Sequence, residues 1–165
     1  MRRSEGIVMR GEITKLSLSC TAFLFLCMLA CVEGVASART IYVPDDYAKI
    51  QWAVDNATAG DTIIVRDGIY HENVNVNKPH LTIKSENGSA NCIVQAKKME
   101  YSTFTITSNN VSIVGFTICG GGDYPVVLAA GIEVSRSSHI IIRNNIVEDN
   151  FCGIFLEDSN CVEIC

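Results

Sequence analysis

Metal-ligating and acidic side chains gather near the end of the sequence. His139 and Cys161 are both soft ligands of the kind that bind copper, and the interval between them is also that of an internal repeat. No third such ligand lines up with them, and one histidine–cysteine contact is most often incidental. Glu157 and Asp158 are adjacent carboxylates, and two carboxylates that face one site cleave glycosidic bonds. Whether either pair acts together depends on the elements that position it.

Other side chains point to sugars. Tyr70, Tyr101 and Tyr124 carry rings that could stack on a sugar ring or pack against a neighbouring loop instead. Asn87 begins the sequon Asn87-Gly88-Ser89 within an insertion between repeated segments. Because glycosylation requires an exposed loop, Asn87 is the best candidate among the sequons of the chain.

A repeat with a period of about 22 residues runs through the end of the chain. Residues 131–134 (GIEV) match residues 153–156 (GIFL), and residues 140–142 (III) match residues 162–164 (VEI) at the same offset. Each segment alternates apolar, variable and apolar positions, which is the pattern of a short β-strand. Looser copies at somewhat longer offsets extend the repeat back to residue 74. Units of this length, with strands separated by Asn, Ser, Gly and Asp, predict the rungs of a parallel β-helix.

The repeat also predicts which side chains face inward. One rung alone cannot bury its apolar face, so successive rungs must stack to form a core. Asn145 is expected at an internal corner, because asparagine tolerates a left-handed turn and its amide can bond to the next rung. Arg136 and Asp158 are separated by one repeat unit, and we expect a surface ion pair between them in place of catalysis. The expected inward columns are Val76, Ile106, Val134 and Leu156 for one strand, and Ile83, Ile113, Ile142 and Ile164 for the other.

The residues before the repeat divide into two predicted segments. Residues 1–38 combine a positive start, an apolar run and small residues before Arg39, which is the order of a secretory signal peptide; a retained membrane anchor is the alternative. Residues 39–72 are expected to cap the β-helix, with an amphipathic helix over residues 47–57 and Asp45 or Asp46 as its N-cap. Residues 73–165 then form the rungs, and because nothing resembling a C-terminal cap follows, we expect the β-helix to be incomplete at that end.

The composition limits the classes of protein to consider. Hydrophobic residues make up 48% and charged residues 19% of the chain, which argues against disorder. The formal net charge is −5 and no block of Lys and Arg stands out, so nucleic acid is not an expected partner. Five of the eight cysteines follow residue 38 without a C-x-x-C pair. We expect them to be mostly buried thiols and not a disulfide framework or a zinc site.

Two stretches resemble a known family. The run TIYVPDDYAKIQWAVDNATAGDTIIVRDGIYHENVNVNKPHLTIKSENG resembles the N-terminal cap and first rung of pectin-lyase-like proteins. The later GIEV, IIIRNNIVEDN and GIFL segments resemble the repeat of the NosD-like, or carbohydrate-binding and sugar-hydrolysis (CASH), group. The resemblance covers nearly all of residues 40–165. It implies an all-β fold, a right-handed parallel β-helix with a short N-terminal capping helix.

The same resemblance does not imply one activity, because this scaffold carries lyases, hydrolases, esterases, adhesins and accessory proteins. The paired aspartates and the Gly-His-Gly motif of polygalacturonases are absent from the sequence, as are the later aspartate motifs of pectin methylesterases. Pectate lyases use calcium and a basic residue, and Arg143 is the central candidate for that base, although no acidic trio clearly faces it. The NosD resemblance adds copper as a possible metal. We expect no bound cofactor.

The sequence therefore predicts an exported module, secreted, on the cell surface or in the periplasm, that binds surface polysaccharide or helps to build an envelope layer without catalysis. A polysaccharide-active lyase or hydrolase is the first alternative, and a periplasmic copper-handling accessory protein is the second. Expected partners are polysaccharide or envelope components, with a membrane only through an uncleaved signal segment. The candidate residues are Glu157, Asp158 and Arg143 for catalysis, Tyr70, Tyr101 and Tyr124 for sugar binding, His139 and Cys161 for metal, and Asn87 for glycosylation.

Overall fold

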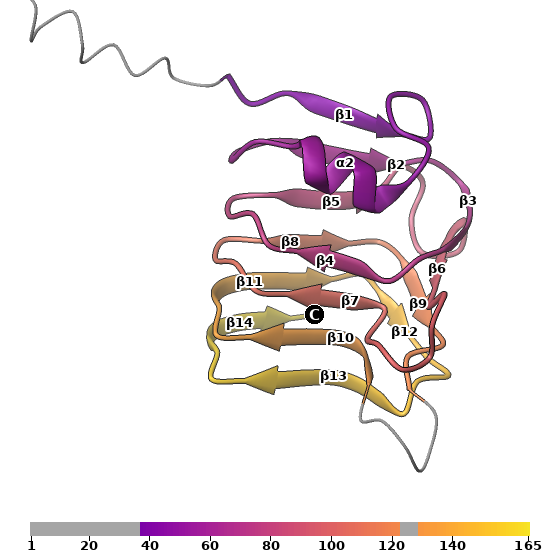
Figure 1. Ribbon diagram of the computed structural model, residues 1–165, viewed down its shortest axis with the longest axis vertical. Helices are drawn as coiled ribbons and strands as arrows, with labels where there is room; N and C mark the ends of the chain where they lie inside the picture. Colours follow the sequence, from indigo (N-terminus) through magenta and orange to yellow (C-terminus); the bar gives the residue numbers. More distant parts are fainter. Residues whose placement is uncertain (1–36, 123–128) are drawn as a thin grey trace, which may run out of the picture. The chain divides into compact units, whose positions relative to one another are not determined.

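The computed structural model describes residues 37–122 and 129–165, all of which belong to one compact unit, Ala36–Cys165. The predicted signal peptide, apart from its last two residues, and Tyr124 lie outside the described residues. The described part contains three parallel sheets, in each of which the strands of successive rungs stack along one axis, with a single short helix beside the first strands (Figure 1). The prediction of an all-β, right-handed parallel β-helix is confirmed.

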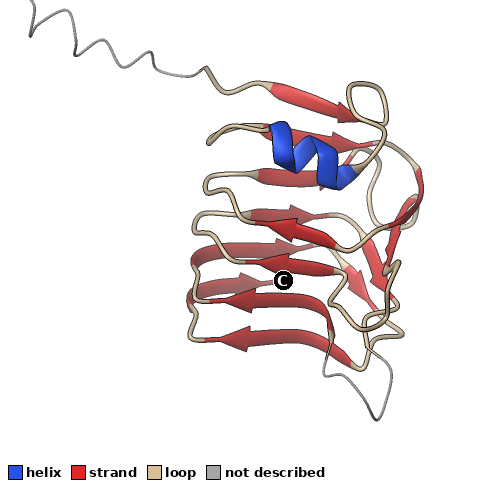
Figure 2. Ribbon diagram, viewed as in Figure 1, coloured by secondary structure: helices blue, strands red, loops and turns tan. Residues whose placement is uncertain are grey.

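From β2 to β13 the chain contributes one strand to each sheet per rung, in the order A, B, C, while β1 and β14 add a strand to sheet A at either end. Figure 2 shows these strands with the one described helix beside them. Sheet A contains β1 (Thr40–Val43), β2 (Thr62–Val65), β5 (Thr82–Ser85), β8 (Ser112–Val114), β11 (Ser138–Arg143) and β14 (Asn160–Ile164). Sheet B contains β3 (Gly68–His71), β6 (Cys92–Gln95), β9 (Thr117–Cys119) and β12 (Ile146–Val147). Sheet C contains β4 (Val74–Val76), β7 (Phe104–Ile106), β10 (Ala130–Ser135) and β13 (Cys152–Glu157).

The observed strand register reproduces the repeat seen in the sequence. Ile132 pairs with Ile154 and Ile140 pairs with Val162, so in both sheets the paired residues are separated by one repeat unit. The two predicted inward columns are buried as far as Val134 and Ile142. Their last members, Leu156 and Ile164, are 44% and 52% exposed, because no described strand lies beyond β13 and β14.

Sheet B was not predicted strand by strand. Its strands have two to four residues, and their spacing from sheet A changes where Glu86–Asn91 are inserted. Short apolar segments with variable spacing carry little periodic signal. Val94 and Ile118 nevertheless point into the same core as the other two sheets, so the core has three walls.

Asparagine side chains hold the corners of successive rungs together. Asn145 Oδ1 accepts a hydrogen bond from the Phe116 N–H at 2.9 Å, and its Nδ2 donates to the Ile113 carbonyl at 2.9 Å. Asn150 bonds in the same way to the Gly121 N–H and the Ile118 carbonyl. The prediction that the Asn145 amide bonds between rungs at a corner is confirmed, although its partners are backbone groups of the preceding rung and the left-handed residue is Asn144.

The capping helix is shorter than predicted and has a different cap. α2 spans Ile50–Asn56, whereas the sequence predicted residues 47–57. Asp46 does not cap it, because its carboxylate accepts a hydrogen bond from the Tyr42 N–H. The N–H groups of Ile50 and Gln51 instead donate to the two carboxylate oxygens of Glu72, each at 3.0 Å. A carboxylate at this end also complements the helix dipole.

Replacing Glu72 with glutamine should therefore lower the free energy of unfolding by about 1–2 kcal/mol, because one helix N–H loses its charged acceptor in a buried setting. Urea unfolding of the full chain followed by circular dichroism measures the change. The exposed Glu100→Gln variant removes the same charge without touching the helix and should leave the midpoint almost unchanged. Equal loss in both variants would rule out the cap as the cause.

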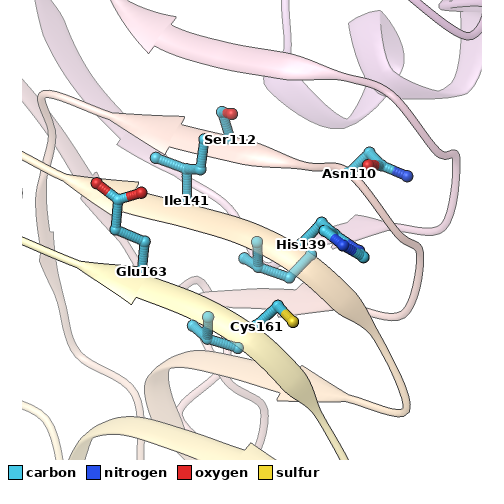
Figure 3. A pocket seen from close by; sticks show the side chains of 8 residues that line it. Asn110, Ser112, His139, Ile141, Cys161 and Glu163 are labelled. Carbon is cyan, nitrogen blue, oxygen red and sulfur yellow. The ribbon is translucent and has the colours of Figure 1, made fainter.

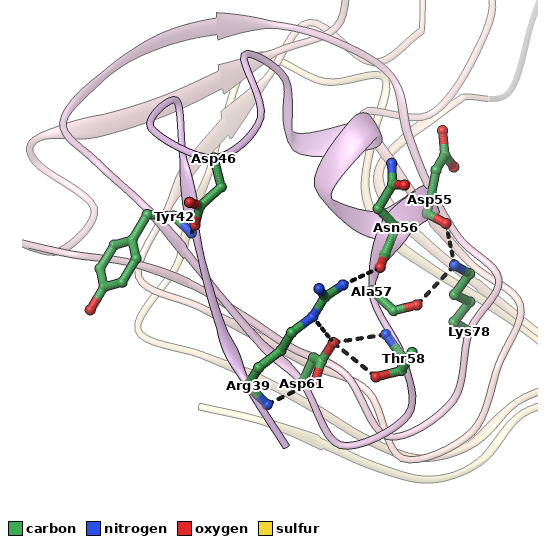
Figure 4. Close-up of polar contacts among 9 residues, drawn as sticks. All are labelled: Arg39, Tyr42, Asp46, Asp55, Asn56, Ala57, Thr58, Asp61 and Lys78. Carbon is green, nitrogen blue, oxygen red and sulfur yellow. Dashed lines mark hydrogen bonds and ion pairs between the residues drawn. The ribbon is translucent and has the colours of Figure 1, made fainter. Parts of the chain in front are cut away.

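A second buried carboxylate, Asp61, ties the first strands together (Figure 4). It accepts hydrogen bonds from the Arg39 N–H at 2.9 Å and Nε at 3.0 Å, and from the Thr58 N–H at 2.8 Å and hydroxyl at 3.0 Å. Burial raises the pKa of Asp61, but these hydrogen bonds outweigh it and lower the pKa to about 2. Asp61 is thus charged at neutral pH and fully satisfied.

Candidate functional site

The three catalytic candidates do not converge. Glu157 ends β13 in sheet C, where its carboxylate accepts a hydrogen bond from the Ser135 hydroxyl at 2.9 Å, and Asp158 follows it at the corner. Arg143 ends β11 in sheet A, five residues beyond Ser138 and thus roughly 16 Å along that strand. The predicted ion pair between Arg136 and Asp158 is wrong: within the described residues no salt bridge joins them. Both residues have positive φ angles of 51° and 46°, so the sequence places them at a left-handed corner.

His139 and Cys161 do come together, at a second left-handed corner. Ser138 pairs with Asn160 and Ile140 with Val162, so His139 and Cys161 face each other on adjacent rungs. Both have positive φ angles, as do His80 and Asn110 at the same corner of earlier rungs. Residues with short polar or ring side chains are enriched in this conformation. The backbone turn alone therefore accounts for histidine at this position.

A hollow of about 530 Å³ opens over this corner. Figure 3 shows its labelled side chains in two rows: Asn110, His139 and Cys161 along the corner, and Ser112, Ile141 and Glu163 along the strands. We call this the corner hollow. Its lining residues are Asn110, Ser112, His139, Ile140, Ile141, Cys161, Val162 and Glu163.

The corner hollow supplies two soft ligands for a metal. In residues 37–122 and 129–165, no group of three or more His, Cys, Asp or Glu side chains is arranged to hold a metal ion. Copper sites in proteins take three or more ligands in most geometries, so His139 and Cys161 do not complete one. The described residues therefore do not fit a copper centre by themselves.

The described cysteines are more exposed than predicted. Cys92 is buried, and that burial raises the pKa of its thiol to about 12. Cys119 and Cys152 are half-buried, while Cys161 and Cys165 are exposed, so the expectation of mostly buried thiols is wrong. The last two lie on the final rung, whose outer side is uncovered in the described part. All five are free thiols.

The two described tyrosine candidates differ in their surroundings. Tyr70 packs against the core, and its hydroxyl donates to the Arg66 carbonyl at 3.0 Å. Burial is the first cause that raises the pKa of Tyr70 to about 12. Tyr101 is 59% exposed, with Lys98 Nζ 5.8 Å from its ring centre. Only Tyr101 of this pair offers an open ring to a ligand.

Tyr101 borders a second hollow, of about 270 Å³, on the outer face of sheet C. We call it the tyrosine hollow, and its lining residues are Asn73, Val74, Asn75, Tyr101, Ser102 and Thr105. Asn73 fixes the loop that carries the ring, because its Nδ2 donates to the carbonyls of Lys98, Tyr101 and Ser102 at 3.0–3.1 Å. Its Oδ1 also accepts the Lys98 N–H at 2.8 Å. No pattern in the sequence indicates this anchor, since Asn73 and Lys98 lie 25 residues apart.

The glycosylation candidate, Asn87, lies in the loop between β5 of sheet A and β6 of sheet B. Asn87 is exposed, and its Nδ2 donates to both carboxylate oxygens of Asp67 at 3.1 Å. Attachment of a glycan would break these two contacts. Because both groups are exposed, the loss would be small.

Comparison with known proteins gives the family. Residues 54–164 match the family model described as periplasmic copper-binding protein (NosD). The chain belongs to the NosD family. The match covers most of the described β-helix, from α2 to the last strand of sheet A.

Similar proteins place this NosD-family chain near the cell surface. It is 38% identical over 130 residues to a cell surface glycoprotein of Methanothermus fervidus, which covers 78% of the chain but only 20% of that relative. The chain thus spans about one fifth of the relative's length. A periplasmic family and a surface relative together indicate an extracellular or surface location. Within the described ranges, no helix has the length and apolar character needed to cross a membrane.

Solved structures support the fold of the NosD-family chain. A pectin methylesterase in complex with a hexasaccharide superposes with a TM-score of 0.61 at 15% identity, covering 73% of this chain and 45% of that one. The pectin methylesterase PemA from Erwinia chrysanthemi superposes with a TM-score of 0.55 at 15% identity, covering 76% of this chain and 45% of that one. At such low identity the similarity concerns the β-helix alone.

Proposed function

We propose that this chain is a non-catalytic module of the cell surface that binds a polysaccharide in the tyrosine hollow. The observation that supports this most is the exposed ring of Tyr101 beside a concave surface that also carries polar side chains. Aromatic rings provide apolar area for the faces of sugars, and polar groups beside them fix orientation. The polar groups available to a ligand here are the side chains of Asn75 and Thr105.

Rigidity strengthens this assignment. Asn73 makes four hydrogen bonds to backbone groups of the loop that carries Tyr101, so the backbone from which the ring projects is held before a ligand arrives. Holding the ring in place reduces the entropy that binding would otherwise cost. Ser102 is fixed too, because its hydroxyl donates to Glu133 at 2.8 Å and accepts the Ala130 N–H at 3.0 Å.

The chemistry of the lining favours binding over cleavage. A glycoside hydrolase needs two carboxylates on either side of the scissile bond. The described lining of the tyrosine hollow contains amide, hydroxyl, aromatic and apolar side chains but no carboxylate. Glu133 lies nearby on β10, and its carboxylate is engaged by Ser102.

The test is glycan binding by the full chain and its Tyr101→Ala variant. A glycan array finds the ligands, and the affinity of each is then measured by calorimetry while release of new reducing ends is followed. We expect Tyr101→Ala to weaken binding about fivefold, since a stacked ring contributes on the order of 1 kcal/mol. No reducing ends should appear.

The matched control is Ile69→Ala, which removes a large apolar side chain that is 62% exposed on sheet B. It should leave glycan affinity unchanged. The proposal fails if Tyr101→Ala binds as tightly as the unmodified chain, or if both variants lose affinity equally. Release of reducing ends would instead support the lyase or hydrolase alternative.

A further inference from the structure

A straight column of hydroxyl groups crosses the outer face of sheet A. Thr40 pairs with Thr62, Thr62 with Thr82, and Thr82 with Ser112, so four consecutive strands place a hydroxyl at the same position. We call these residues the hydroxyl column. Adjacent strands lie roughly 4.8 Å apart, so the hydroxyls are evenly spaced along the axis of the β-helix.

The hydroxyl column has no internal role. Within the described residues, the hydroxyls of Thr62, Thr82 and Ser112 make no hydrogen bond to the protein, and all three are partly exposed. Hydroxyls elsewhere are engaged: those of Thr103 and Thr117, for example, donate to backbone carbonyls at 3.0 and 2.9 Å. The column therefore offers both donors and acceptors to solvent or to a ligand.

Unpaired cations run beside the hydroxyl column. Lys84 and Arg143 project from the neighbouring outward position, and Val114 lies between them in the register. Two strand spacings separate them, roughly 10 Å. Both are exposed and neither has a carboxylate partner in the described part, whereas Arg39 and Arg66 are ion-paired. This face therefore presents two unpaired cations to solvent, with Glu163 as a carboxylate further along it.

The other side of the column is bounded by the corner that carries His80, Asn110 and His139. Beyond Ser112 the column continues through Ile141 to Glu163, and this stretch is the floor of the corner hollow (Figure 3). The face is thus one continuous track: hydroxyls along the middle, cations on one side, imidazoles on the other, and a hollow of about 530 Å³ at one end.

We infer that the outer face of sheet A binds an acidic polysaccharide whose chain runs along the axis of the β-helix. The inference rests on the proposed function in assigning sugar binding to this chain, but it concerns a different face and a charged class of sugar. Lys84 and Arg143 would bind carboxylates on the polymer, and the hydroxyl column would hydrogen-bond to the sugar hydroxyls between them. Charge complementarity selects an anionic polymer over a neutral one.

The spacing explains why the chain runs along the axis. An extended polysaccharide advances by about one strand spacing per sugar, so Lys84 and Arg143 would meet alternate sugars. A polymer with one carboxylate per disaccharide fits this pattern. Glu163 is the opposing group: as a carboxylate in the corner hollow, it would repel an anionic chain at that end.

The test uses hyaluronate, in which every second sugar carries a carboxylate, and its neutral methyl ester. We expect the full chain to bind hyaluronate and not the ester, with affinity that falls as salt is raised. The double variant Lys84→Gln/Arg143→Gln should weaken hyaluronate binding at least about tenfold, because two charged contacts are lost. Glu163→Gln should strengthen it a few fold, by removal of repulsion.

Two controls distinguish binding on this track from diffuse charge attraction and from binding in the tyrosine hollow. Lys97→Gln removes an equally exposed cation away from sheet A and should leave hyaluronate affinity unchanged. Tyr101→Ala should also leave hyaluronate affinity unchanged, while it weakens the binding of those glycans that occupy the tyrosine hollow. The inference is overturned if hyaluronate does not bind, if its neutral ester binds equally, or if Lys97→Gln weakens binding as much as the double variant. Absence of hyaluronate binding with retained Tyr101-dependent binding would overturn this inference and leave the proposed function intact.

Discussion

Replacing Asp61 with alanine should lower the free energy of unfolding by about 3 kcal/mol at pH 7. The substitution leaves the N–H groups of Arg39 and Thr58 without an acceptor at a buried position, and it removes the partner of the Arg39 guanidinium. Asp61 links Arg39, which precedes β1, to the turn that precedes β2. The substitution therefore destabilises the N-terminal end of the β-helix. Urea unfolding of the full chain measures it.

The same carboxylate predicts a dependence on pH. The pKa of Asp61 is lowered to about 2 in the folded chain, against about 3.9 in an unfolded one. The stabilisation is therefore complete above about pH 4 and is lost as the pH falls from about 4 towards 2. The Asp61→Asn variant should lack this contribution to the acid limb of the stability curve.

The exposed helical carboxylate Asp55 gives the matched control. Its side chain accepts one hydrogen bond from Gln51 on the surface of α2, and Asp55→Asn should change stability by less than about 0.5 kcal/mol. If Asp61→Asn keeps the acid limb of the unmodified chain unaltered, the assignment of that limb to Asp61 is wrong.

Replacing Phe104 with alanine should lower the free energy of unfolding by about 3–5 kcal/mol. Phe104 is fully buried in β7, and its ring centre lies 5.9 Å from that of Phe116. Val74 and Ile132 occupy the same column on the strands to either side. Because those strands are fixed by backbone pairing, the rungs cannot close over the cavity. Thermal and urea unfolding measure the loss.

Phe155→Ala is the control for this cavity. Phe155 is the same residue type in the same sheet, but it points outward and is 45% exposed. Its removal should cost less than about 1 kcal/mol. Similar losses for the two phenylalanines would show that burial between rungs does not determine the effect.

The sequence was sufficient for the fold because the repeat is a direct record of strand pairing. Residues in one column share apolar character and return at a fixed offset, so Val134 and Ile142 could be placed without coordinates. The helix boundary was missed for the opposite reason. Asp45 and Asp46 provided a local N-cap signal, whereas the actual cap, Glu72, lies a full rung beyond Ile50. A contact of that range is visible only once the rungs are stacked.

For the candidate sites too, residue types and repeat positions could be read from the sequence, whereas contacts between distant residues could not. Tyr101 could be proposed from its type alone, but Asn73, which holds its loop, could not. The offset of one repeat unit between His139 and Cys161 agrees with their places on adjacent rungs, while their left-handed backbone was not predicted. Half of the hydroxyl column can be read from the sequence, because Thr82 and Ser112 each precede an inward residue of one repeat column, Ile83 and Ile113. Thr40 and Thr62 escaped notice since they lie in residues that were assigned to the cap.

The sequence distance between paired strands also sets the order in which this chain can fold. Neighbouring strands of sheet C are separated by a whole rung of sequence, so each added rung closes a loop of that length before any ladder bond forms. Closing the loop is favourable only when a folded rung is already present for the new strands to pair with. During synthesis, α2 and the first strands of sheet A leave the ribosome before the rest of the described chain. Growth of one rung at a time from a formed nucleus is therefore the route of lowest entropy cost, and during synthesis the rung beside α2 is the first available nucleus. This folding route predicts slow formation of the first rung and faster addition of the later rungs.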